Sequence, residues 1–118
     1  MKRDMELVRK ILIAAEEKQD FQPQKLEIDG YSQEEISYHI KIMTQAGLIE
    51  SQGYATSTGI PLWCIKSLTW EGHEFLDAAR NEKVWTKVKK KIAEEGGSIP
   101  FDVLKHVLKQ TTATLFLG

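Results

Sequence analysis

Residues 32–50 read SQEEISYHIKIMTQAGLIE and contain both a start and a stop signal for a helix. Ser32 and Glu35 have the spacing of a capping box, in which the side chain of each residue accepts from the backbone amide of the other. Gly47 suits the left-handed residue that closes a helix. Apolar residues between these signals recur at three- and four-residue spacing: Ile36, Ile40 and Met43. The pattern predicts a helix from about Gln33 to Ala46.

The segments around this helix predict another helix, a short strand and a β-hairpin. Asp4 is a suitable N-cap for a helix over residues 4–18, whose apolar side chains share one face. Apolar residues alternate with polar ones over residues 26–31, which predicts a short edge strand. Residues 48–51 and 61–66 are typical of two strands, and the polar, glycine-containing segment between them predicts a long hairpin tip.

The rest of the chain predicts three more helices. Thr69 and Asn81 are N-cap candidates for helices over residues 70–80 and 82–95, and a last helix follows them. Residues 111–117 have poor helix propensity, so we expect this end to fray or to be held by a partner. All the tryptophans occupy apolar positions and are expected in the core: Trp63, Trp70 and Trp85.

The overall composition is that of an ordinary globular protein. The chain has 118 residues, which suits one structural domain, with 42% hydrophobic and 28% charged residues. A net charge of -1 excludes a strongly basic nucleic-acid binder but allows a local basic patch. No segment is long and apolar enough for a transmembrane span or a signal peptide. We therefore expect a cytoplasmic protein with no membrane partner.

The sequence lacks the usual patterns of metal sites and catalysis. Cys64 is the only cysteine, which excludes an intrachain disulfide and a four-cysteine zinc site. The three histidines, His39, His73 and His106, have no metal-ligand spacing, and we expect His39 to be a packed, hydrogen-bonded side chain. No nucleophile elbow, phosphate loop or dinucleotide motif is present. We expect neither enzyme activity nor a metal, cofactor or small-molecule ligand.

Residues 35–50 resemble the recognition helix of winged helix-turn-helix regulators, which carries Ser-x-His and ends in Gly-Leu-Ile before the first wing strand. Ser37 and His39 match the first pattern, and Gly47-Leu48-Ile49 matches the second. LTWEGHEFL, residues 68–76, is similar to the start of the helix after the wing. The resemblance implies an α+β fold within a single structural domain. It places a winged helix over residues 1–80 and a helical extension, packed on it, over residues 81–118.

The chain is more similar still to a family of bacteria and their phages known as domain of unknown function 2513. Residues 1–5, 68–80 and 96–101 are similar to its recurring segments. The resemblance implies a bacterial or phage-related protein but brings no assigned activity. A standard winged helix has a positioning helix before the recognition helix. Pro23 and Gly30 leave room for one turn at most, unless the helix from Ser32 replaces both.

The exposed face of the helix after Ser32 carries the candidate DNA-binding residues. Lys41 suits a phosphate or a guanine, Gln45 suits an adenine, and the hydroxyl groups of Ser37 and Tyr38 suit phosphate. Lys66 on the second hairpin strand would extend the basic surface. Against this, Lys41 is the single cation on the helix and the hairpin tip has none. The leading hypothesis is a small DNA-binding regulator, and the alternative is a protein-interaction module that uses the same fold without DNA.

Two features of the C-terminal region bear on partners. Lys83, Lys87 and Lys90 form one stripe, which would suit a phosphate backbone, although a solvated helix face is the simpler interpretation. The last helix has more apolar surface than one contact needs. We therefore predict a homodimer with these interface residues: Val103, Val107 and Leu115.

Overall fold

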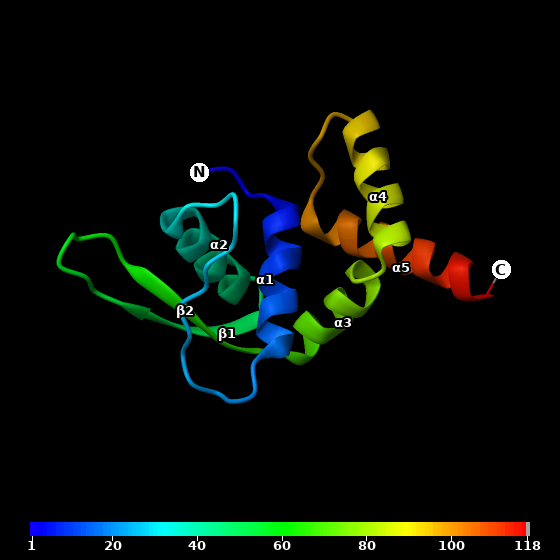
Figure 1. Cartoon of the computed structure of the whole chain (residues 1–118). Helices are drawn as coiled ribbons and strands as arrows, with labels where there is room; N and C mark the ends of the chain where they lie inside the picture. Colours follow the sequence, from blue (N-terminus) through cyan, green and yellow to red (C-terminus); the bar gives the residue numbers. More distant parts are fainter. Residues whose placement is uncertain (118) are drawn as a thin grey trace. The chain divides into compact units, whose positions relative to one another are not determined.

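The computed structural model describes residues 1–117 and has an α+β fold, as the sequence predicts (Figure 1). One antiparallel sheet of two strands accompanies five helices in these residues. The elements in chain order are α1 (Met5–Glu17), α2 (Gln33–Gln45), β1 (Ile49–Tyr54), β2 (Leu62–Leu68), α3 (Trp70–Ala79), α4 (Glu82–Glu94) and α5 (Phe101–Leu117).

The chain divides into two compact units. The first spans Met1–His73 and contains α1, α2 and the β-hairpin, and the second begins at Glu74 and contains α4 and α5. The division falls inside α3, whereas the sequence-based division at residues 80 and 81 lies just after this helix.

Local chemistry determines both ends of α2. The Ser32 side chain accepts from the Glu35 amide at 3.1 Å, and the Glu35 carboxylate accepts from the Ser32 amide at 3.0 Å, which completes the predicted capping box. At the other end Gly47 has φ +78°, and the Leu48 amide donates to the Met43 carbonyl at 3.0 Å. This is a Schellman turn, so the predicted start and stop signals are confirmed.

We predict that Ser32→Ala lowers the free energy of unfolding by about 1 kcal/mol, because the Glu35 amide loses its acceptor. Urea unfolding of wild type and variant measures the difference. Ser57→Ala, at an exposed position in the hairpin tip, is the matched control and should leave stability unchanged. Equal unfolding midpoints for Ser32→Ala and Ser57→Ala would contradict the role of the cap.

The core of the first unit forms where α1 packs against α2 and β2. Its fully buried side chains include Leu7, Ile11 and Leu12 of α1, Ile36 and Ile40 of α2, and Ile65 of β2. The three- and four-residue spacing seen in the sequence places these α1 and α2 residues on facing apolar stripes.

His39 joins α2 to the start of α1 from within this core. Its ring is 1% exposed, the Asp4 amide donates to Nε2 at 2.9 Å, and Nδ1 lies 2.8 Å from the Glu35 carbonyl oxygen. Because a carbonyl can only accept, Nδ1 donates and Nε2 accepts, which fixes a neutral ring. Asp4 in turn caps α1, as predicted, by accepting from the amides of Glu6 and Leu7. The expectation of a packed, hydrogen-bonded histidine is confirmed.

The predicted edge strand over residues 26–31 is wrong. In this part of the chain, pairing with the sheet is limited to one bridge between Gln24 and Ile65. The Leu26 carbonyl accepts from the Gln33 side-chain amide at 3.0 Å, which occupies a group that a strand would use for pairing. Leu26 is buried, so the apolar residue is needed for the core rather than for a strand.

Two further expectations are wrong in the C-terminal half. Residues 111–117 do not fray in the structure but continue α5 to Leu117, because extending an existing helix adds a hydrogen bond for each residue fixed. Trp70 is 77% exposed rather than in the core. The buried side of α3 contains Phe75, Leu76 and Ala79, and Trp70 lies opposite them at 100° per residue.

Candidate nucleic-acid interface

The exposed face of α2 contains three of the predicted DNA-binding residues. Lys41 and Gln45 are exposed and lie four residues apart, and Tyr38 is half-buried one turn before Lys41. The next residue in this row towards the N-terminus is Glu34, which is also exposed. The row offers a cation, an amide and a phenol for contacts with phosphate or base edges. Its N-terminal end is acidic and would repel phosphate.

Ser37, predicted to contact phosphate, instead lies in the interior. The residue is 5% exposed, and its Oγ accepts from the Trp63 amide at 3.2 Å. The hydroxyl therefore connects α2 to β2 and is not presented to a partner. Its position on the border of the buried stripe, three residues before Ile40, could have indicated this packing from the sequence.

A second hydroxyl connection, which the sequence did not reveal, joins α2 to β1. Thr44 donates from Oγ1 to the Ile40 carbonyl at 2.8 Å, and Ser51 Oγ lies 2.6 Å from Thr44 Oγ1. Because the Thr44 proton is committed to the carbonyl, the Ser51 hydroxyl is the donor in the second bond. Ser37 and Thr44 together hold the hairpin against α2. Figure 1 shows the hairpin extending past this helix.

Lys66 lies at a β-bulge in the second strand of the hairpin. The strand pairing passes from Glu50–Ser67 to Ser51–Ile65, so Lys66 has no partner in β1. A bulge bends the strand and redirects the extra side chain. Lys66 lines a hollow with His73 and residues 15–21 at the end of α1, and Lys41 is not part of that hollow. The structure does not bring the two lysines together in this hollow.

The tip of the hairpin presents an uncharged, partly aromatic surface. Tyr54 and Ile60 are 41% and 47% exposed, and residues 52–60 contain no Lys or Arg. Gly53 lies under the ring of Trp63, where a Cβ atom would be 3.0 Å from Trp63 Cε2. Tyr54, Pro61 and Trp63 help to line a shallow hollow at this place. The tip of the hairpin can offer apolar contact but no phosphate contact from a cationic side chain.

The charge of the first unit also opposes binding to a polyanion. Residues 1–73 contain eight Lys and Arg against eleven Asp and Glu, which gives a net charge of -3. Arg9, one of these cations, is 5% exposed and lies 3.7 Å from the Glu6 carboxylate. Binding of duplex DNA through this unit would depend on a few local contacts rather than on its overall field.

The structure also locates the groups with catalytic or metal-binding chemistry. Cys64 is buried in β2, and burial raises the pKa of its thiol, while the positive charge of Lys25 opposes that rise. The raised pKa favours the neutral thiol over the nucleophilic thiolate. No group of three His, Cys, Asp or Glu side chains within residues 1–117 is placed to hold a metal ion. In the same residues, no helix has the length and hydrophobicity to cross a membrane.

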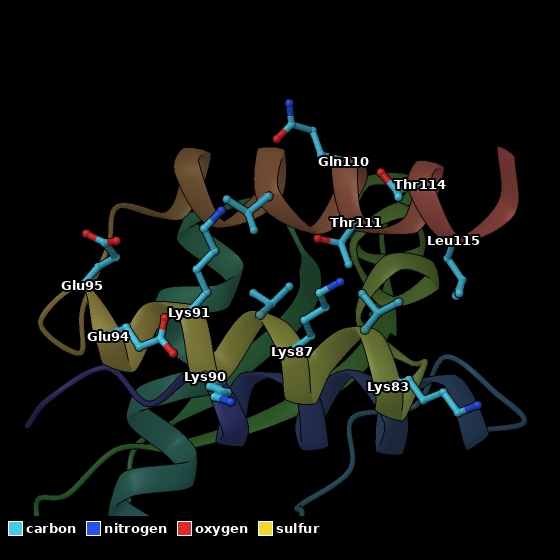
Figure 2. A pocket seen from close by; sticks show the side chains of 13 residues that line it. Lys83, Lys87, Lys90, Lys91, Glu94, Glu95, Gln110, Thr111, Thr114 and Leu115 are labelled. Atoms are coloured by element: carbon cyan, nitrogen blue, oxygen red, sulfur yellow. The ribbon is translucent and has the colours of Figure 1, made fainter. Parts of the chain in front are cut away.

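The predicted dimer residues lie on α5. Val103 and Leu115 are 46% and 52% exposed, and Val107 is half-buried. Val107 and Leu115 line a groove between α5 and α4, which Figure 2 shows from close by. Val103 is not among the residues that line this groove.

Comparison with known proteins finds one family and a bacterial relative. The model of a family described as "Hypothetical protein (DUF2513)" matches residues 2–98, which include α1 to α4. A relative from Haemophilus influenzae, called "Uncharacterized protein", is 36% identical over 109 residues, which cover 91% of this chain and 92% of the relative. No solved structure matches at a significant level.

Proposed function

The chain belongs to the DUF2513 family, and we propose that it is a non-enzymatic winged-helix protein that binds double-stranded DNA through α2. The order of α1, α2, hairpin and α3 supports this assignment, with the hairpin as the wing. Residues 18–32 contain no helix, so α2 takes the place of both the positioning and the recognition helix. This role places the protein in the cytoplasm of a bacterial cell.

The observation that carries the proposal is the exposed pair of Lys41 and Gln45. Both side chains are free of the hydrogen bonds that fix Ser37 and Thr44, and they lie one helical turn apart. A lysine contact with a phosphate or a guanine raises the affinity of a protein for DNA, and a glutamine side chain can pair with the edge of adenine. Because Glu34 repels phosphate at the N-terminal end of α2, DNA would approach only the C-terminal half of this helix.

We predict that Lys41→Glu weakens duplex binding about tenfold and reduces the slope of log affinity against log salt by about one, because one phosphate contact is lost. Fluorescence anisotropy with a labelled random-sequence duplex, from about 50 to 200 mM salt, measures both effects. Lys25→Glu makes the same charge change at an exposed position outside α2 and is the control.

Two results would contradict the DNA proposal. A wild-type protein without duplex affinity at low salt overturns it outright. Equal losses for Lys41→Glu and Lys25→Glu would show that net charge, rather than α2, governs binding.

A protein-interaction module is the second candidate function. The net charge of -3 in residues 1–73 and the uncharged hairpin tip over residues 52–60 favour it. In this case α2 and the hairpin would contact a protein surface, with Tyr54 and Trp63 as apolar contacts. If a variant that has lost its affinity for duplex DNA still binds a partner protein, the second function rather than the first is supported.

A further inference from the structure

The second unit contains a groove that combines lysines with an aliphatic floor. The groove lies between α4 and α5 and has a volume of about 990 Å³ (Figure 2). Four lysines of α4 line it: Lys83, Lys87, Lys90 and Lys91. Aliphatic side chains from both helices form the floor: Val84, Val88, Val107 and Leu115.

The two helices contribute different chemistry to the groove. Val84 and Val88 are 3% and 1% exposed, so α4 supplies a closed apolar base, and Leu115 leaves an open apolar edge on α5. Figure 2 shows Lys91 pointing from α4 towards α5, and Thr111 and Leu115 pointing from α5 towards α4. Glu94 and Glu95 stand at one end, so the lining has four positive and two negative side chains.

The lysine spacing favours a helical ligand. Lys83, Lys87 and Lys90 are four and three residues apart and therefore lie along one side of α4. Carboxylates at the same intervals on a second helix would lie opposite them, since each residue advances a helix by about 1.5 Å. A row of apolar side chains next to those carboxylates would reach Val107 and Leu115, the aliphatic lining residues that keep exposed surface.

We infer that this groove binds an acidic amphipathic helix of a partner protein. The apolar floor would hold the apolar face of that helix, and the lysine row would pair with its carboxylates. The inference goes beyond the proposed DNA contact, because it concerns different residues in a different unit.

The lining fits this ligand better than a nucleic acid or a second copy of the chain. The residues that line the groove include no aromatic ring to stack on a base and no arginine to clamp a phosphate. A homodimer through Val107 and Leu115, as the sequence predicts, could pair groove with groove, and this would bring the lysine rows of both copies together. Like charges would then oppose the contact that Val107 and Leu115 favour.

Fluorescence anisotropy of a synthetic helix tests the inference with the full chain. The probe is a labelled peptide of about 15 residues, with leucines at three- and four-residue spacing and glutamates beside them. The control probe has the same composition in scrambled order, so it keeps the charge and loses the apolar face. We expect micromolar binding of the first peptide and at least about tenfold weaker binding of the second.

Paired variants locate the binding surface. The double change Lys87→Glu and Lys90→Glu should weaken peptide binding by at least about tenfold, because two attractive pairs become repulsive. Lys109→Glu changes an exposed lysine of α5 outside the groove and should change binding less than twofold. Lys41→Glu should also leave it unchanged, which separates this test from the DNA proposal. Unfolding midpoints of all variants verify that they are folded.

Each alternative ligand has a distinct result, and each overturns the inference. If the ordered and the scrambled peptides bind equally well, the groove attracts negative charge but does not recognise an amphipathic helix. The groove would be a nucleic-acid surface if a labelled single-stranded oligonucleotide binds and the helical peptide does not. The double variant should then bind the oligonucleotide more weakly. A dimer in sedimentation that excludes the peptide and dissociates on Val107→Lys would assign the groove to a second copy.

Discussion

Replacing Gly72 with alanine is expected to lower the free energy of unfolding by about 3 kcal/mol, because a methyl group has no room there. In an ordinary helix interior the same change would stabilise the fold by about 1 kcal/mol. Gly72 lies in the first turn of α3, next to Leu48 in the connection between α2 and β1. A Cβ atom would overlap the Leu48 carbonyl oxygen and lie 3.0 Å from the Leu48 carbonyl carbon.

The atoms that Gly72 approaches cannot move aside cheaply. The Leu48 carbonyl accepts from the Thr69 amide at 3.1 Å, and the Thr69 hydroxyl donates to the Gly47 carbonyl at 2.5 Å. The same Thr69 oxygen accepts from the Gly72 amide at 3.0 Å. Relief of the overlap would therefore disturb the cap of α3 and the turn that ends α2 together.

Urea unfolding of Gly72→Ala measures this cost, and Glu71→Ala, an exposed change in the same turn, is its control. We expect the control to remain within about 1 kcal/mol of wild type. A Gly72→Ala protein that is as stable as wild type would show that α3 and the α2–β1 turn are further apart than the structure places them.

Gly72 also illustrates which parts of the fold could be predicted from the sequence. The caps of α1, α2 and α4 depend on residues within a few positions of each other, so Asp4, Ser32 and Asn81 were correctly identified. The reason for a glycine at position 72 depends on Leu48, which is distant in the chain. Resemblance to a motif identified the glycine, but only the structure shows the contact that requires it.

The candidate site follows the same division. Lys41 and Gln45 lie on the exposed side of α2, as helix periodicity predicts. The burial of Ser37 depends on the Trp63 amide across the interface with β2, and the placement of Lys66 depends on a bulge in the pairing with β1. Neither the hydrogen bond nor the bulge has a local sequence pattern, because each requires a partner from another element.

The tryptophans show the same limit, and they provide a sharp comparison. Sequence periodicity placed Trp70 and Trp85 in the core alike, but Trp85 is 1% exposed and Trp70 is 77% exposed. Trp85 lies in α4 between Val84 and Val88, which are also buried. We predict that Trp85→Ala lowers the free energy of unfolding by about 3–5 kcal/mol, because it removes a large buried ring and leaves a cavity.

Trp70→Ala is the matched control, since the same ring is removed from an exposed position. Its expected effect is within about 0.5 kcal/mol, because little contact is lost and alanine has the higher helix propensity. Unfolding followed by circular dichroism suits both variants, as it does not depend on the tryptophan that was removed. Similar losses for the two variants would contradict the exposure of Trp70 and indicate that a partner or a second copy covers it in solution. A small loss for Trp85→Ala would instead contradict the packing of α4 around this ring.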